Sequence, residues 1–297
     1  MTAITLLDGG MGQELVHRAG DRPTPFWSTQ VMIDHPGLVE AVHADYFAAG
    51  ATIATTNTYA IHRDRLECTA LSDRFEDLYR LAIEAATTAR AAHGSGRIAG
   101  SIGPLRASYR PDLHPPSDVA RPLFSEVAGL LAPSCDLLII ETAVSLAHVS
   151  DALAGAATTS LPVWLAVSVD DRDGTRLRSG EALADVLPLA AQGAGAVLVN
   201  CSAPEAIAAS LPILAKGALP FGAYANGFQQ ITSDFLKDKP TVDALASRRD
   251  LGPEAYAEHA MSWVDAGATI VGGCCEVGPA HISEIARRLR AAGHTIV

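Results

Sequence analysis

The chain has 297 residues, of which 48% are hydrophobic and 19% are charged, and its formal net charge at pH 7 is −11. This composition excludes a disordered or fibrous chain and suits a large buried core. The acidic balance, without a long basic run, argues against a nucleic-acid partner and against binding to an anionic membrane surface.

Short β-branched runs alternate with alanine-rich amphipathic stretches along the whole chain. Most of the runs are almost continuously apolar, which is typical of strands buried on both faces in a parallel sheet. The predicted strands, in chain order, are Ile4–Asp8, Thr52–Thr56, Ile98–Ile102, Leu137–Glu141, Val163–Val169, Ala196–Asn200, Phe221–Ala225 and Thr269–Gly272. Helices are predicted near residues 37–49, 72–92, 117–132, 145–158, 182–192, 204–215, 253–266 and 279–292.

Proline and glycine support these boundaries. A first helical turn tolerates proline, and three predicted helices begin with one, at Pro204, Pro253 and Pro279. The tripeptide Ala-Gly-Ala recurs where a helix should stop, at 49–51, 194–196 and 266–268. Glycine after a helix accepts the left-handed conformation of a C-cap. Eight strand–helix pairs predict a (β/α)8 barrel, a single domain over residues 1–297, with a doubly wound open sheet as the alternative.

Two connections in this barrel are longer than simple turns. One runs from about Gly103 to Ser117 and carries several prolines, and the other runs from about Asn226 to Gly252. Both follow strands, so we expect them at the C-terminal face, where barrel active sites lie. Loops of this length in compact domains usually act as lids or mobile functional segments.

Three cysteines follow predicted strands at that same face. Cys201 follows the sixth strand, and Gly272-Gly273-Cys274-Cys275 follows the last one. Adjacent side chains of an extended strand point to opposite faces, so we expect the glycines to let the backbone turn and bring both sulfurs inward. Three thiolates leave a tetrahedral zinc ion one open position, as in catalytic sites. The alternative, buried cysteines acting as small hydrophobes, is weaker for a cluster on one face.

Other candidate ligands lack such a context. Cys68 lies in a loop or helix start and Cys135 just before a strand, so both are interpreted as structural. Asp170, Asp171 and Asp173 follow the fifth strand and are interpreted as a solvated acidic loop instead of a calcium site.

The amino-terminal segment and the cysteine count predict a cytoplasmic protein. The first eight residues lack the basic start and apolar core of a signal peptide. No apolar run reaches the roughly 18 to 20 residues that span a bilayer. Five cysteines are an odd number and too few for a disulfide framework in a chain of this length. In a reducing cytosol, clustered cysteines more often bind metals or act in catalysis.

Six segments match a known family in order and spacing: Leu7-Asp8-Gly9-Gly10-Met11-Gly12, Thr56-Asn57-Thr58-Tyr59, Ser101-Ile102-Gly103-Pro104, Glu141-Thr142, Asn200-Cys201 and Gly272-Gly273-Cys274-Cys275. Through them the chain resembles the homocysteine S-methyltransferase family over nearly its full length. The resemblance implies a (β/α)8 barrel with zinc on the three cysteines, homocysteine as methyl acceptor and a place in methionine biosynthesis. After Cys275 the family often continues with Thr-Thr-Pro, whereas this chain reads Glu276-Val277-Gly278-Pro279.

The resemblance also implies how an amino-acid substrate is anchored. The loop Asp8-Gly9-Gly10-Met11 would hold the carboxylate of homocysteine, because glycines let backbone N–H groups approach an anion. Glu141, at the end of an otherwise apolar strand, would meet the substrate ammonium. Its alternative interpretation is a structural ion pair inside the barrel.

Two aromatic residues, Trp27 and Tyr59, align with the donor site of betaine-using relatives and would face a cationic methyl donor through cation–π contact. Trp27 alone is also interpretable as a core or lid residue. Where betaine enzymes carry a tyrosine beside the glutamate, this chain has Thr142, which favours a sulfonium such as S-methylmethionine over betaine.

The predicted reaction needs no general base, because zinc deprotonates a coordinated thiol. The resulting electron-rich site suits a cationic donor. A non-catalytic zinc- or thiol-binding barrel is the alternative from another class, and the intact Asp8 loop and Glu141 argue against it. The sequence is compatible with an oligomer.

Overall fold

The computed structural model describes residues 2–20, 24, 26–228 and 247–297. All eight predicted strands are present as β1 (Ala3–Leu6), β2 (Ile53–Thr55), β3 (Arg97–Ile102), β4 (Leu137–Ala143), β5 (Val163–Val167), β6 (Ala196–Asn200), β7 (Phe221–Tyr224) and β8 (Ile270–Val271). Neighbours pair in parallel from β2 to β8, and β8 pairs with β1. A parallel bridge between Leu7 and Ile53 joins β1 to β2, so the strands close into the predicted barrel.

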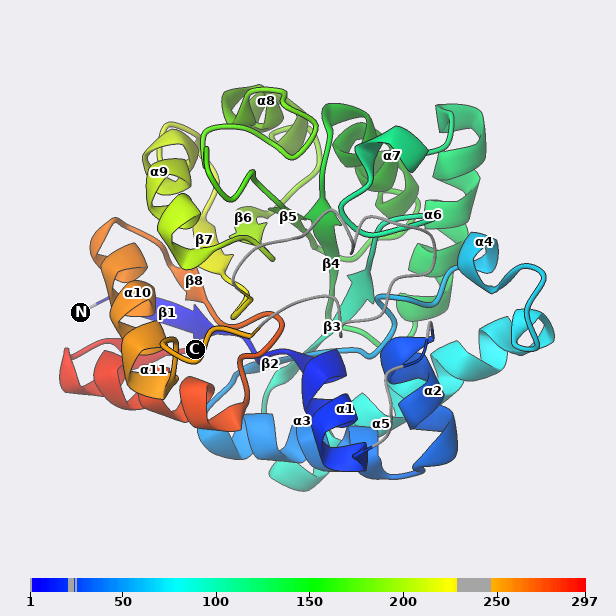
Figure 1. Ribbon diagram of the computed structural model, residues 1–297, viewed down its shortest axis with the longest axis horizontal. Coiled ribbons are helices and arrows are strands. Elements are labelled where there is room, and N and C mark those ends of the chain that lie inside the picture. The colour runs from blue at the N-terminus through cyan, green and yellow to red at the C-terminus, as the bar shows by residue number, and fades with distance from the viewer. Residues whose placement is uncertain (1, 21–23, 25, 229–246) are drawn as a thin grey trace.

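Helices surround the strands on the outside (Figure 1). Each predicted helix is present: α3 (Leu38–Ala49), α5 (Phe75–His93), α6 (Ser117–Leu131), α7 (Leu146–Ala156), α9 (Pro204–Leu214), α10 (Pro253–Asp265), α11 (Pro279–Ala291) and, at 182–192, the 3-10 turn η3 (Leu183–Asp185) with α8 (Val186–Ala190). The helix predicted at 72–92 begins with the 3-10 turn η1 (Ser72–Arg74). Elements that the sequence did not predict are α1 (Met11–Ala19), α2 (Trp27–Asp34), α4 (Arg63–Leu66), η2 (Pro111–Leu113) and β9 (Thr295–Ile296). Glycine lowers helix propensity, but Gly12 in α1 makes room for the Trp27 ring.

The barrel interior explains which strand residues reach the functional face. Its apolar layer consists of Leu7, Ile53, Ala99, Leu137, Ile139, Ala166, Ala196, Leu198, Tyr224 and Ile270. Because side chains alternate along a strand, residues two positions further on point inward again. This places Thr55, Ser101, Glu141 and Asn200 inside the barrel, directly above the apolar layer at the C-terminal ends of their strands.

Most of the predicted helix ends are confirmed. Proline occupies the first turn of α9, α10 and α11. Gly50 and Gly267 have left-handed φ angles of 109° and 100° after α3 and α10. The prediction for Gly195 is wrong: α8 ends at Ala190, and the Gly195 N–H instead donates to the carbonyl of Val163 at 2.7 Å, which leads the chain into β6.

The long connection from 226 to 252 falls largely outside the described residues, which stop at 228 and resume at 247. Of the helices that the structure describes, none is both long enough and apolar enough to cross a membrane.

The protein has three buried histidines, and we expect them to make it less stable at acidic pH. Burial lowers the pKa of His43, His62 and His148 to about 3. The unfolded chain titrates near 6.5, so between about pH 6.5 and pH 3 it binds more protons than the folded chain. The histidines therefore make their full contribution to the free energy of unfolding above the unfolded pKa. This contribution is lost as pH falls toward the folded pKa. In this range each histidine lowers the free energy of unfolding by up to about 1.4 kcal/mol per pH unit.

Urea unfolding at about pH 7 and pH 5 measures this loss. The variant His148→Phe keeps a ring against Phe124, whose ring centroid lies 5.6 Å from that of His148, but removes the titrating group. We expect it to reduce the pH dependence of the free energy of unfolding. His93 is exposed, and His93→Asn is the matched control that should leave the dependence unchanged. A His148→Phe protein with the wild-type pH dependence contradicts the prediction.

Candidate metal centre and substrate cavity

The C-terminal ends of the barrel strands surround a cavity of about 740 Å³. A cavity of this size accommodates small organic ligands. The predicted site residues come from distant parts of the chain, and all of them line this cavity: Asp8, Gly9, Gly10, Met11, Trp27, Tyr59, Glu141, Cys201, Cys274 and Cys275.

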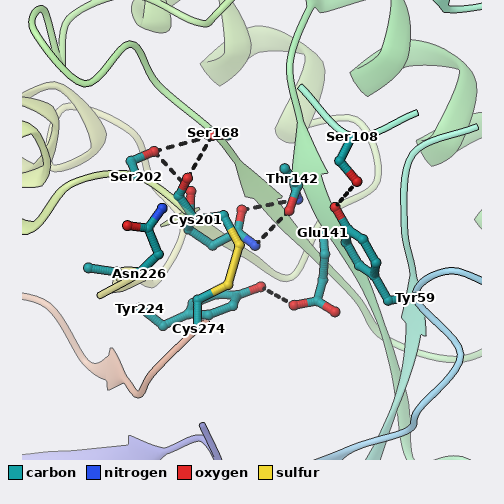
Figure 2. Close-up of a disulfide and its surroundings, with 12 residues drawn as sticks. Tyr59, Ser108, Glu141, Thr142, Ser168, Cys201, Ser202, Tyr224, Asn226 and Cys274 are labelled. Carbon is teal, nitrogen blue, oxygen red and sulfur yellow. Dashed lines mark hydrogen bonds between the residues drawn. A yellow bond between two sulfur atoms is a disulfide. The ribbon is translucent and has the colours of Figure 1, made fainter. Parts of the chain in front are cut away.

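The three predicted metal ligands lie together at one end of the cavity. The sulfur atoms of Cys201, Cys274 and Cys275 are within 4.8 Å of one another. Cys201 and Cys274 form a disulfide with their Cα atoms 5.8 Å apart (Figure 2). Cys275 is a free cysteine. Tyr109 and Phe228 pack against this cluster. Once the disulfide is reduced, three soft thiolates within reach of one ion form a metal-binding set.

The two glycines before the cysteine pair allow close packing and do not themselves form the predicted turn. A side chain at Gly272 would collide with the loop after β1, and one at Gly273 would collide with Val277. The chain turns after Cys275, where Glu276 has a left-handed φ of 65°. The glycines therefore allow the Cys274–Cys275 segment to approach β1 closely, and the left-handed Glu276 provides the turn.

A buried ion pair holds the backbone of Cys201. Cys201 has a φ of 46°, which is unusual for a residue other than glycine. Its carbonyl accepts hydrogen bonds from Ser168 Oγ at 3.2 Å and from Arg178 Nη2 at 3.1 Å. Arg178 also donates to both carboxylate oxygens of Asp171, at 2.9 and 3.2 Å. Both side chains of this pair are only 10% exposed, so the predicted solvated environment of Asp171 is wrong.

We expect Arg178→Met to lower the metal affinity of the protein by about 10- to 100-fold, the range found when groups that support a ligand are removed. Methionine fills similar space but can bond neither the Cys201 carbonyl nor the carboxylate of Asp171. A chelator competition titration of the reduced protein measures the affinity. Arg176→Met removes an exposed arginine two residues away and serves as the control. Unchanged affinity in Arg178→Met would show that the pair does not support Cys201.

Two acidic side chains face the cavity beside the cysteines. Glu141 accepts hydrogen bonds from Tyr224 Oη at 2.9 Å and from Ser101 Oγ at 2.5 Å (Figure 2 shows the former). Burial raises its pKa. Within the described part of the chain Glu141 has no basic partner, so the alternative of a structural ion pair finds no support there.

Asp8 is the second acid. Its oxygens accept from the Thr55 N–H at 2.7 Å and from Thr55 Oγ1 at 2.8 Å, and it is 3% exposed. Burial raises the pKa of Asp8 to about 7 against the effect of these hydrogen bonds, and the charge of Glu141 adds to the rise. Two neighbouring acids in a buried cavity favour a bound cation between them.

The glycines of the loop after β1 were expected to offer their N–H groups to a carboxylate, and the structure gives them a different role. A side chain at Gly9 would collide with the carbonyl of Val277, and one at Gly10 with that of Cys274. The Gly10 N–H donates to Val277 O and the Met11 N–H to Gly9 O, both at 2.9 Å, so these two amides are already bonded. Met11 and Gly12, in the first turn of α1, line the cavity, and the first N–H groups of a helix have no partner within the helix.

The two predicted donor-site aromatics are in contact. The rings of Trp27 and Tyr59 meet edge to face, with centroids 6.3 Å apart. Trp27 Nε1 donates to Gln13 Oε1 at 2.9 Å, and Gln13 Nε2 donates to Glu276 Oε1 at 2.6 Å. Glu276, where the chain departs from the family pattern, thus helps to hold Trp27 through Gln13.

Sequence reasoning missed two residues that shape the site. Tyr224 holds Glu141, and its only signal is its inward position in the predicted strand 221–225. Asn200 binds Thr142, whose φ is 56°, by accepting from its N–H at 3.0 Å and donating to its Oγ1 at 3.2 Å. Of the two cysteines interpreted as structural, Cys135 is buried as expected, but Cys68 is exposed at the cavity and does not pack in the core.

Comparison with known proteins agrees with this geometry. The family model described as homocysteine S-methyltransferase matches residues 5–289. Homocysteine S-methyltransferase of Escherichia coli (strain K12) is 30% identical over 308 residues, covering 96% of this chain and 95% of that protein. The structure of homocysteine methyltransferase MmuM from Escherichia coli in its metallated form has a TM-score of 0.80 at 28% identity, covering 97% of this chain and 96% of that one. Its oxidized form also has a TM-score of 0.80, at 29% identity, covering 96% of both chains.

Proposed function

The chain belongs to the homocysteine S-methyltransferase family, and we propose that it transfers a methyl group from a sulfonium donor to the thiol of homocysteine on a zinc ion held by Cys201, Cys274 and Cys275. The observation that carries the proposal is the sharing of one cavity by this three-sulfur cluster and two carboxylates, the buried Asp8 and the half-buried Glu141. An amino acid with a thiol side chain matches both halves of that cavity.

The cysteine cluster fits zinc. Zn–S bonds of about 2.3 Å in a tetrahedron separate the sulfurs by about 3.8 Å, which is compatible with sulfur atoms within 4.8 Å of one another. Bound zinc would keep the substrate sulfur as a nucleophilic thiolate at neutral pH. Metal binding requires reduction of the Cys201–Cys274 disulfide, so we propose that the protein works in a reducing, cytoplasmic compartment.

The side chains of the cavity would orient the two substrates. Glu141 and Asp8 would accept hydrogen bonds from the homocysteine ammonium, while the first turn of α1 would receive its carboxylate. Trp27 and Tyr59 would place the positive donor centre by cation–π contact. This orientation sets the thiolate in line with the methyl group, and alignment supplies much of the rate.

The transfer itself balances without a protein acid or base. The sulfur of homocysteine donates an electron pair to the methyl carbon, and the bond from that carbon to the donor sulfur breaks. The released pair returns to the donor, which leaves as a neutral thioether, and methionine is the product. The step converts a thiolate and a sulfonium into two neutral thioethers, so both reacting charges are neutralised together.

Thr142 favours a sulfonium over betaine, because betaine-using relatives carry a tyrosine at that position. A betaine-dependent reaction is the second candidate, since the Trp27–Tyr59 pair would also face a quaternary ammonium. A zinc- or thiol-binding protein without turnover is the third.

A donor panel tests the proposal. Reduced, zinc-quantified protein is assayed with homocysteine and S-methylmethionine, S-adenosylmethionine, dimethylsulfoniopropionate or betaine. We expect methionine from a sulfonium donor. Methionine from betaine alone would replace the sulfonium assignment, and one bound zinc without methionine from any donor would favour the binding protein.

A further inference from the structure

The cavity wall near Tyr59 carries a half-buried cation that forms no ion pair with any residue that the structure describes. Arg65, on the short helix α4, lines the cavity. Its Nε and Nη2 both donate to the carbonyl of Pro104, at 3.0 and 2.6 Å. Among the described residues Arg65 forms no ion pair, whereas Arg63, two positions earlier, pairs with Glu126 at 2.7 Å.

The hydrogen bonds of Arg65 leave part of its guanidinium available. A guanidinium has five N–H donors in a planar fork and matches a carboxylate with two parallel bonds. Pro104 receives bonds from one edge only, and it is a neutral acceptor. Arg65 is half-buried, and a partly desolvated cation gains from a directly paired anion, so an anionic ligand at the remaining edge would stabilise this arrangement.

Arg65 is next to the aromatic pair assigned to the methyl donor. Its Cζ lies 5.8 Å from the ring centroid of Tyr59, which in turn contacts Trp27. Asp8 and Glu141, the acids assigned to the homocysteine ammonium, line the same cavity. An onium ion without an anionic group would be repelled by Arg65, whereas a donor that carries its own carboxylate would pair with it.

We propose that Arg65 binds the carboxylate of the methyl donor, so that the enzyme selects sulfonium carboxylates over onium ions that lack a carboxylate. This inference rests on the proposed function, because it takes the Trp27–Tyr59 wall as the donor side of the cavity. It adds the chemical class of the donor and the residue that recognises it.

Matched donor pairs test the assignment. Dimethylsulfoniopropionate is compared with dimethylpropylsulfonium, and S-methylmethionine with its carboxamide, by isothermal titration of the zinc-loaded protein and by initial rates of methionine formation. We expect the wild-type protein to bind the carboxylate member of a pair at least about tenfold more tightly. Arg65→Met should abolish this preference while the KM for homocysteine and the zinc content stay unchanged.

Two further variants complete the design. Arg65→Lys should keep part of the carboxylate preference that Arg65→Met loses. Lysine has the positive charge of arginine but lacks its planar fork of N–H donors. Arg63→Met removes a cation two residues away that does not line the cavity, and it should behave as wild type. If Arg65→Met fails to fold, Arg65→Lys and the wild-type donor pairs still test the assignment.

The assignment is overturned if the wild-type protein shows no carboxylate preference, if it binds neither member of either pair, or if Arg65→Met keeps the preference. Methionine formation without a carboxylate preference would overturn only the role of Arg65. An Arg65-dependent preference without methionine formation would support the carboxylate site and overturn the proposed reaction instead.

Discussion

Cys274→Ser should lose most of its zinc and all measurable methyl transfer. A serine hydroxyl stays protonated near neutral pH and is a poor zinc ligand, so only the thiolates of Cys201 and Cys275 would remain. The sulfur of homocysteine would then stay largely protonated, because a free thiol titrates near 8.5. A metal ion contributes several kcal/mol to such reactions, so we expect a decrease in kcat/KM of about a thousandfold or more.

Zinc is quantified by release to a colorimetric chelator, and turnover is measured under reducing conditions. Cys135→Ala is the matched control, because Cys135 is a free, buried cysteine outside the cavity. It should keep its zinc and its activity. A Cys274→Ser protein with one zinc and full activity would exclude the metal assignment, and zinc retained without activity would show that Cys274 is needed for turnover but not for holding the metal.

Replacement of Glu141 should affect homocysteine binding and leave the metal in place. A hydrogen bond to a charged group contributes about 1.5–3 kcal/mol, so we expect Glu141→Ala to raise the KM for homocysteine about 10- to 150-fold. Glu141→Gln keeps the size of the side chain and removes only its charge. It should therefore raise the KM nearly as much if the partner is an ammonium group.

The variant Tyr224→Phe separates the role of Glu141 in binding homocysteine from the role of Tyr224 in positioning Glu141. It removes the 2.9 Å hydrogen bond to Glu141 but keeps the aromatic ring in the barrel interior. We expect a smaller increase in KM, about two- to tenfold, since Glu141 keeps its charge and its hydrogen bond from Ser101. Normal homocysteine affinity in both Glu141 variants, with lowered thermal stability, would assign Glu141 a structural role.

The sequence alone predicted the barrel and the convergence of its main site residues. Eight apolar runs alternated with amphipathic stretches, and only a parallel sheet covered by helices buries both. Because the C-terminal ends of parallel strands meet at one face, Glu141, Cys201 and the Cys274–Cys275 pair had to approach one another. The chemistry proposed for them follows from residue type and strand position.

The contacts of the loops were decided only by the tertiary structure. Asp171 looked solvated in the sequence, yet Arg178 folds back over it and also bonds the carbonyl of Cys201. Gly10 looked like an anion-binding residue, yet its N–H is already bonded to Val277.

Arg65 gave no signal at all, since an arginine on a short helix is usually solvated. Its proposed role rests on its half-buried position beside Tyr59 and on the lack of an ion pair with any of the described residues. Strand positions follow a local periodicity that the sequence carries. The partner of a loop side chain depends on how distant segments pack, and no local pattern encodes that.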